Sequence, residues 1–225
     1  MSIDNSESYG RILRLPRTAL TQAQIFFAEG KFDHCAATIL DSMGVKAGVL
    51  RSFFIGGHSR IGKSLVAKYL TQKGFSIVET DSTRRAYYTG SKPDPGAQCA
   101  REALYRKAAQ CQKRIGFEGS DILHFVKNGG SVPKENLVFW LILRESDRQW
   151  KIESLAESSR AGIDIKRDWS DCVRIVDRII RDSKRLIEEA DSIENFHLID
   201  MGRGGASMLD LAELASTRIA DILSA

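Results

Sequence analysis

The chain has 225 residues, of which 43% are hydrophobic and 28% are charged, and its formal net charge is +4. This composition is typical of a globular protein with one well-sized core, and the small net charge gives no indication of nucleic-acid binding. No apolar run approaches the roughly eighteen residues of a membrane span, and the polar first ten residues lack the pattern of a secretory signal. The four cysteines form no C-x-x-C pair, which favours free thiols over disulfides or a zinc site. We therefore expect a cytoplasmic protein that makes no membrane contact.

The first fifty residues are expected to form a unit of their own. Residues 1–10 are polar and are predicted to be disordered. Apolar residues recur at helical spacing over residues 18–28 and 32–43, where they predict two helices. We expect a helical hairpin within residues 1–50 that packs against a main domain over residues 51–225.

From residue 51 onward, short apolar runs alternate with helical patterns. The runs predict buried strands at residues 52–56, at 76–81, within 115–122, at 137–143 and at 196–201. The clearest helical patterns span residues 172–187 and 207–223. Strands that are apolar throughout and alternate with helices indicate a parallel sheet covered on both faces. We therefore predict an α/β fold with three α/β/α layers and a parallel sheet of five strands.

A glycine-rich segment directly follows the first of these strands. Residues 57–64 read Gly-His-Ser-Arg-Ile-Gly-Lys-Ser and fit the phosphate-binding pattern G-x-x-x-x-G-K-[ST], with an amphipathic helix beginning inside it. Its glycines allow backbone N–H groups to turn inward around a phosphate, and the helix start adds its positive dipole end. In this motif Lys63 reaches the β- and γ-phosphates of ATP, and the Ser64 hydroxyl ligates Mg²⁺. The expected nucleotide-binding residues are Gly57, His58, Ser59, Arg60, Ile61, Gly62, Lys63, Ser64 and Leu65.

The class of nucleotide-binding protein depends on what accompanies this motif. The strand–loop–helix context favours ATP binding over the alternative interpretation, a glycine-rich turn without a ligand. A Ras-type GTPase needs the string N-K-x-D for guanine, and no such string occurs. The ring-forming ATPases need a helical lid domain, for which the chain is too short. These absences favour a kinase of the P-loop NTPase fold.

An acidic and a basic residue lie three positions apart where the second predicted strand ends. Asp81 and Arg84 form the pattern D-x-x-R, and residues three apart share one face of a helix. We expect both side chains to point into the cleft above the carboxyl edge of the sheet, where such folds bind ligands. There Asp81 would take the proton of an acceptor hydroxyl or hold a Mg²⁺-bound water, and Arg84 would grip the acceptor or the transferring phosphoryl group. The alternative is a helix cap with a surface ion pair.

Together these segments resemble the small P-loop kinases from about residue 51 to the end of the chain. The resemblance rests on the phosphate loop, on E-T-D-S-T-R at residues 79–84, on F-E-G at 117–119 and on R-E-S-D-R-Q-W-K at 144–151. Among these kinases, 2-phosphoglycerate kinase is the most similar, with polynucleotide kinase and zeta-toxin-type kinases as relatives. In one respect the loop differs from the family, because Arg60 stands where these kinases usually have glycine.

The resemblance implies an acceptor side and a metal site. Asp81 matches the family's acid at the end of the second strand, and Arg84 matches its arginine on the acceptor side. Glu118 matches a residue on the third strand near the metal and the acceptor. By this resemblance the Mg²⁺ site consists of Ser64, Asp81 and Glu118.

The resemblance also implies a mobile lid over about residues 144–168, which brings arginines over the phosphates during transfer. Arg144, Arg148 and Lys151 lie at helical spacing there, and Arg160 lies further along. Arg148 and Arg160 are the expected catalytic arginines, in addition to Lys63, Asp81 and Arg84. The alternative for this segment is a solvated helix.

The stretch after the second predicted strand carries an excess of basic residues. Between residues 84 and 114, Asp94 and Glu102 oppose the cations Arg84, Arg85, Lys92, Arg101, Arg106, Lys107, Lys113 and Arg114. Because this stretch commonly forms the acceptor side of the fold, the imbalance favours an anionic acceptor, with a solvated basic helix as the alternative. The tyrosines interleaved there, which would either stack a base or pack as helix residues, are Tyr87, Tyr88 and Tyr105.

The first hypothesis for function is therefore a Mg²⁺-dependent kinase that transfers the γ-phosphoryl group of ATP to a small, anionic metabolite. A nucleotide or a polynucleotide 5′-hydroxyl is the alternative acceptor, although nucleic acid is not favoured. An ATP-binding regulatory NTPase, with residues 1–50 contacting a partner, is the alternative from another class. The sequence gives no indication of the oligomeric state.

Overall fold

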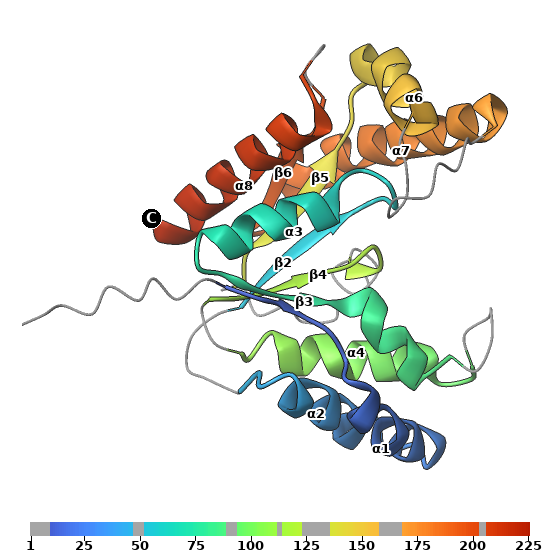
Figure 1. Cartoon of the computed structure of the whole chain (residues 1–225), viewed down its shortest axis with the longest axis vertical. Coiled ribbons are helices and arrows are strands. Elements are labelled where there is room, and N and C mark those ends of the chain that lie inside the picture. Colours follow the sequence, from blue (N-terminus) through green and yellow to red (C-terminus); the bar gives the residue numbers. More distant parts are fainter. Residues whose placement is uncertain are drawn as a thin grey trace, which may run out of the picture.

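The sheet at the centre of the molecule is parallel throughout. The structure, a computed structural model, describes residues 10–46, 52–88, 94–111, 114–122, 136–157, 168–202 and 206–225. Six strands pair in the order β1-β3-β4-β2-β5-β6, and every neighbouring pair is parallel (Figure 1). They are β1 (Ile12–Leu13), β2 (Phe53–Gly57), β3 (Ser76–Glu79), β4 (Ile115–Glu118), β5 (Val138–Ile142) and β6 (Phe196–Asp200). The predicted α/β class and the parallel sheet are confirmed.

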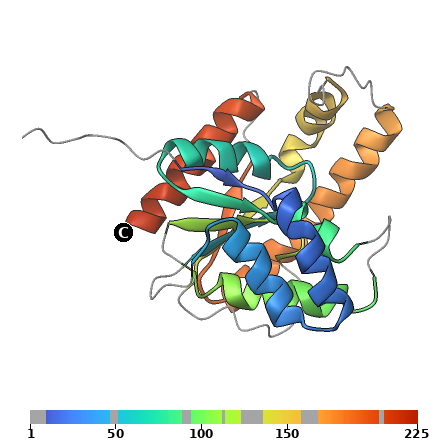
Figure 2. The same cartoon turned by 60° about the horizontal axis from the view of Figure 1, so that its bottom comes forward.

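Helices cover both faces of this sheet. The α-helices in the described part of the chain are α1 (Arg17–Ala28), α2 (Phe32–Ser42), α3 (Lys63–Gln72), α4 (Ala97–Ala108), α6 (Arg148–Glu157), α7 (Trp169–Glu189) and α8 (Met208–Ser224). Short 3₁₀ helices occur at η1 (Thr80–Ala86), η2 (Glu145–Asp147) and η3 (Ala190–Ser192). Helices α3 and α8 lie together on one side of the sheet, and α4 lies on the other side with α1 and α2 outside it (Figures 1 and 2). The arrangement is consistent with three α/β/α layers.

Two hydrophobic clusters fill the space on either side of the sheet. Successive residues of a strand point to opposite faces. On β2, accordingly, Phe53 and Ile55 pack in the cluster with α3 and α8, while Phe54 packs in the cluster with α4. On β5, Phe139 belongs to the first cluster and Trp140 to the second. Burial on both faces explains why these strands read as continuous apolar runs.

The prediction of five strands is wrong by one, because a short strand joins the sheet before the first helix. β1 pairs with β3 along the outer edge of the sheet, and the Ile77 amide donates to the Arg11 carbonyl at 2.8 Å. The Leu15 amide also donates to the Ser82 hydroxyl at 3.1 Å. A strand of two residues is too short to produce an alternating pattern, so the sequence gives no sign of it.

The N-terminal helices share the core of the sheet. Helices α1 and α2 lie where the helical spacing predicts them, and their buried residues Ala23, Cys35 and Ile39 belong to the cluster that also contains α4. The predicted disorder of residues 1–10 falls almost wholly on residues 1–9, which lie outside the described part of the chain. All four cysteines are free thiols. Among the described helices, none is both long enough and apolar enough to cross a membrane.

Candidate functional site

The loop between β2 and α3 contains backbone conformations that demand glycine. Gly57 has a φ of 151° and Gly62 a φ of 118°. A Cβ on Gly57 would lie 3.0 Å from a methyl group of Ile61, and one on Gly62 would lie 2.7 Å from the methyl group of Met208. Both glycines of the predicted motif are therefore required by backbone angle and by close packing. The loop leaves β2 at the carboxyl edge of the sheet and leads straight into α3.

Arg60 adopts a left-handed conformation in this loop, with a φ of 75°. This conformation costs a side-chain-bearing residue about 1–2 kcal/mol relative to the right-handed one, which gives a physical reason for glycine to occur at this point of such loops. The Arg60 side chain lines the cavity enclosed by the loop. The structure therefore combines a strained backbone with a basic residue in the wall of the loop cavity.

Replacing Arg60 by glycine is expected to raise the free energy of unfolding by about 0.5–1 kcal/mol, because relief of the left-handed strain exceeds the added flexibility of the unfolded chain. Urea denaturation measures this change. Asn195 has a φ of 58° in a tight turn, and Asn195→Gly serves as the control with a smaller gain, since asparagine tolerates this region well. A loss of stability in Arg60→Gly larger than 1 kcal/mol would contradict the strain argument.

Lys63 is the first residue of α3, and only 7% of its surface is exposed. Its Nζ donates to the His58 carbonyl across the loop at 3.2 Å and lies 3.8 Å from Oε1 of Glu118. Burial lowers the pKa of Lys63, and the neighbouring Glu118 carboxylate partly opposes this effect. Glu118 is 4% exposed, and burial raises the pKa of its carboxyl to about 7 against the opposing influence of Lys63. Both groups are held in a site that disfavours their charged forms.

These side chains face a cavity of about 440 Å³, which we call the loop cavity. It lies where β2, β3 and β4 end, at the edge where parallel sheets bind ligands. Its lining residues are Ser59, Arg60, Gly62, Lys63, Ser64, Leu65, Glu79, Asp81, Glu118, Lys151, Ser154, Leu155 and Met208. The structure thus brings together most of the predicted loop residues with the three residues expected to hold Mg²⁺. Of the loop residues predicted from the sequence, Gly57, His58 and Ile61 lie outside this lining.

Asp81 and Arg84 lie in η1, directly after β3. Nη2 of Arg84 lies 3.0 Å from Oδ1 of Asp81 and donates to the Ser120 hydroxyl at 3.2 Å. Its Nε is buried without a hydrogen-bond partner. The expected shared face is present, but only Asp81 reaches the loop cavity. Arg84 instead holds Asp81 in place from behind.

The lid arginines that the structure describes do not line the loop cavity. Nε of Arg148 donates to Oδ1 of Asp177 on α7 at 2.7 Å, so this guanidinium ties α6 to α7. Nε of Arg144 donates to Oδ2 of Asp200 at 2.6 Å. Arg160 lies outside the described residues. Arg148 therefore has a structural role in this conformation, and its predicted catalytic role would require the ion pair to break.

Lys151 is the cation that the sequence did not single out as a site residue. It lies one turn after Arg148 on α6, yet only 2% of its surface is exposed and its side chain lines the loop cavity. Nζ lies 3.1 Å from the sulfur of Met208 and 5.7 Å from the centre of the Trp150 ring. Within the described chain no carboxylate forms an ion pair with it, and burial lowers the pKa of Lys151 to about 8. Helical spacing alone does not separate it from its exposed neighbours.

Half of the described cations in the basic stretch after β3 form ion pairs within the protein. Arg101 forms an ion pair with Asp121 at 3.2 Å, and Arg106 forms one with Asp33 on α2 at 3.2 Å. Tyr87 and Tyr105 are buried, which favours packing over base stacking. Lys92 and Lys113 lie outside the described residues. Among the described cations of this stretch, none lines the loop cavity, and the predicted anionic acceptor stays a prediction.

Comparisons with known proteins assign the chain to no family. No protein-family model matches the chain, and a search of the curated proteins found no match. Within the described residues, no group of three or more histidine, cysteine, aspartate or glutamate side chains is arranged to hold a metal ion by itself. The function must therefore be inferred from the loop cavity and its surroundings.

Proposed function

We propose that the chain is a cytoplasmic, Mg²⁺-dependent kinase of the P-loop type that transfers the γ-phosphoryl group of ATP to a small acceptor. The observation that carries the proposal is that two buried lysines, Lys63 and Lys151, face one cavity beside a glycine-bounded loop and two carboxylates. Lys63 lies 3.8 Å from Glu118, whereas Lys151 forms no ion pair with a described carboxylate, and a buried ammonium group without an anionic partner is unfavourable. A polyphosphate would supply the missing negative charge.

The donor site follows from this charge arrangement. The loop amides and the start of α3 are suited to phosphate oxygens, and Lys63 and Lys151 approach the same cavity from α3 and α6. A second cavity of about 390 Å³ shares Ser154 and Met208 with the loop cavity and is also lined by Trp150 and Ser207. The two connected spaces suit a polyphosphate and the nucleoside attached to it, respectively.

The residues around the loop cavity also fit Mg²⁺. Mg²⁺ prefers oxygen ligands and is usually bound through one or two carboxylates together with waters and substrate phosphates. Ser64, Asp81 and Glu118 supply a hydroxyl and two carboxylates to the cavity, and ATP would complete the set. Bound there, the ion would neutralise charge on the phosphates.

On the acceptor side, different residues of the chain would activate the acceptor and stabilise the transferring group. Asp81 would accept the proton of the attacking hydroxyl, and Arg84 would hold the Asp81 carboxylate in orientation through the 3.0 Å ion pair. Lys63 and Lys151 would stabilise the charge that develops on the transferring group. Lys63, Glu118 and Lys151 are almost wholly buried, which limits the access of water to their side of the cavity.

A screen for labelled-phosphate transfer from ATP to metabolites, nucleotides and oligonucleotides tests the proposal. For the best acceptor, Asp81→Asn is expected to lower the transfer rate by about a hundredfold, because it removes the proton acceptor, while ATP affinity measured without Mg²⁺ stays within about twofold. Asp41→Asn, at an exposed position of α2, is the control. Slow ATP hydrolysis that no compound accelerates would contradict the kinase and favour a regulatory NTPase.

A further inference from the structure

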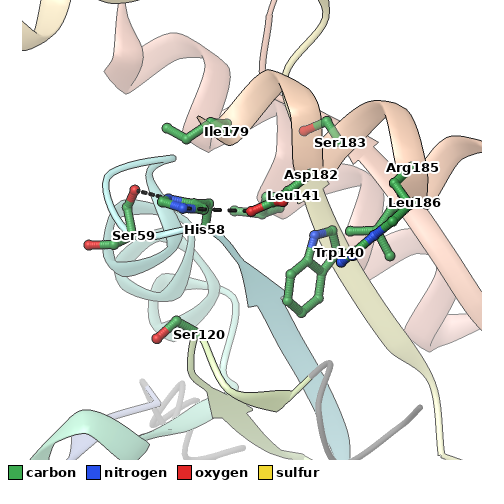
Figure 3. A pocket seen from close by; sticks show the side chains of 10 residues that line it. All are labelled: His58, Ser59, Ser120, Trp140, Leu141, Ile179, Asp182, Ser183, Arg185 and Leu186. Carbon is green, nitrogen blue, oxygen red and sulfur yellow. Dashed lines mark hydrogen bonds and ion pairs between the residues drawn. The ribbon is translucent and has the colours of Figure 1, made fainter. Parts of the chain in front are cut away.

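A further cavity, of about 290 Å³ and distinct from the two described above, lies on the other side of the β2–α3 loop (Figure 3). We call it the α7 cavity, because helix α7 forms one of its walls. Its lining residues are His58, Ser59, Ser120, Trp140, Leu141, Ile179, Asp182, Ser183, Arg185 and Leu186. They come from the loop, from the end of β4, from β5 and from α7. Most of these residues have no place in the donor site.

Trp140 forms a rigid wall of the α7 cavity. Only 6% of its surface is exposed, its ring stacks on Phe196 at 6.4 Å, and a Cβ on Gly56 would lie 2.0 Å from the indole. Figure 3 shows the indole nitrogen on the side of the ring that faces His58 and Leu141. Within the described chain this N–H has no hydrogen-bond acceptor. Because this N–H is not fully enclosed, a ligand oxygen can reach it and take the place of water as its acceptor.

The charges around the α7 cavity are few and nearly balanced. Arg185 supplies one guanidinium and Asp182 one carboxylate, and Nε2 of His58 lies 3.8 Å from Oδ2 of Asp182. Nδ1 of His58 lies 2.9 Å from the Ser59 carbonyl, so its ring joins the loop to α7 (Figure 3). Nε of Arg185 also lies 3.9 Å from Oε1 of Glu189, but an ion pair this long between exposed side chains contributes little. The guanidinium can therefore turn to a single carboxylate of a ligand. A phosphomonoester, with nearly two charges at neutral pH, would be poorly neutralised there.

The remaining walls are apolar. Leu141, Ile179 and Leu186 line the cavity beside the face of Trp140, and apolar walls with a few placed polar groups are typical of sites for small organic molecules. The matching ligand has an apolar carbon body, one carboxylate and at least one hydroxyl. The carboxylate would accept from Trp140 and Arg185.

The α7 cavity adjoins the loop cavity. Ser59 lines both. Ser120, at the boundary of the α7 cavity, accepts a hydrogen bond from Arg84 at 3.2 Å, and Arg84 pairs with Asp81 in the loop cavity. A hydroxyl of a ligand held in the α7 cavity would therefore meet the donor site on the side of Ser59 and Ser120, and Arg84 links Ser120 to Asp81.

We propose that the α7 cavity is the acceptor site, and that the acceptor is a small hydroxylated carboxylic acid with an apolar carbon body. This inference rests on the proposed kinase function. In the transfer step the acceptor hydroxyl oxygen bonds to the γ-phosphorus, and the bond from that phosphorus to the β–γ bridging oxygen breaks. The hydroxyl proton passes to the Asp81 carboxylate, and ADP leaves with the bridging oxygen. No further reactant is needed.

Nuclear magnetic resonance of the indole N–H groups tests the site without requiring activity. The chain has three tryptophans, so Trp140→Phe assigns the Trp140 signal while keeping an apolar ring. Pantoate, a dihydroxy acid with a dimethylated carbon, is the probe, with 2-phosphoglycerate and uridine as comparison ligands. Pantoate is expected to shift the Trp140 signal saturably, and to do so equally well when ADP is bound.

Two substitutions separate this ligand site from general effects on the fold. Trp140→Phe and Arg185→Gln are each expected to weaken pantoate binding about tenfold or more, since each removes a hydrogen bond to a charged group. Arg181→Gln, an exposed arginine one turn earlier on α7, is expected to leave binding unchanged. Labelled phosphate from ATP should then appear on hydroxy acids of this class.

Three results would overturn the inference. If no hydroxy acid shifts the Trp140 signal, the α7 cavity is not a binding site for this class of ligand. Tighter binding of 2-phosphoglycerate than of pantoate would contradict the proposed ligand class. Transfer to an acceptor that leaves the Trp140 signal unchanged would place the acceptor elsewhere while the kinase function stands. Conversely, saturable pantoate binding without phosphoryl transfer to any compound would contradict the acceptor role and the proposed function together.

Discussion

Replacing Lys63 by alanine is expected to lower the rate of phosphoryl transfer by about 10³-fold or more, since one well-placed cation on the transferring group has effects of this size. ATP binding should weaken as well, because Nζ of Lys63 is buried beside the loop and faces the loop cavity. Transfer of labelled phosphate measures the first effect, and calorimetric titration with ATP measures the second.

The control for this substitution is Lys68→Ala on the same helix. Lys68 is exposed and lies away from the loop cavity, so its loss should change neither quantity by more than about twofold. The Lys63 variant is expected to remain folded, because Glu118, whose pKa burial already raises to about 7, can take up a proton when its cationic partner is removed. Normal transfer by a folded Lys63→Ala protein would disprove the phosphate-binding role of the loop.

Replacing Lys151 by methionine is expected to change stability and ligand binding in opposite directions. Burial lowers the pKa of Lys151 to about 8, and a shift of this size corresponds to roughly 3 kcal/mol against the charged form. Methionine removes that penalty, so the free energy of unfolding at pH 7 should rise. ATP affinity should fall by about 10- to 100-fold, because a charge-assisted contact to the phosphates is lost.

The pH dependence of this pair of proteins follows from the direction of the shift. The folded-state pKa of Lys151, about 8, lies below the unfolded value of about 10.4. Between these values the unfolded chain binds more protons, so the stability of the unsubstituted protein rises with pH. The stability advantage of Lys151→Met should therefore shrink from about pH 8 to about pH 10.4. Over the lower part of this range, ATP affinity of the unsubstituted protein should fall as the free ammonium loses its proton.

Urea denaturation and ATP titration at several pH values measure both trends. Lys68→Met provides the control, since an exposed lysine carries no burial penalty and should show no such window. A Lys151→Met protein that is less stable at pH 7 and binds ATP normally would show that this lysine is a packing residue.

Most of the fold follows from periodicity. The five longer strands lie within two residues of their predicted ranges, because burial on both faces makes each a continuous apolar run. β1 escaped prediction because it is held by pairing with β3 and by hydrogen bonds of the flanking residues Arg11 and Leu15, and neither contact has a local sequence pattern. Pairing between residues more than sixty positions apart leaves no signal in either segment.

The candidate site likewise contains residues that the sequence predicts and residues that it does not. The loop motif, Asp81 and Glu118 meet in one cavity because they end neighbouring parallel strands, which sequence order allows one to predict. Lys151, Trp140 and Arg148 depend instead on how α6 and α7 are rotated against the sheet. The burial of Lys151, the cavity beside Trp140 and the ion pair of Arg148 all depend on the packing of these helices, which the sequence pattern does not reveal.

The short first strand has a consequence for how the protein must be handled. β1 covers the backbone N–H and C=O groups of β3, which would otherwise be the open edge of the sheet. Such an edge readily pairs with strands of other molecules and promotes aggregation, whereas an edge strand of two residues offers little length for pairing. A version of the chain that begins at α1 should therefore self-associate through β3. Strand β1 is accordingly expected to protect the protein from fibril formation.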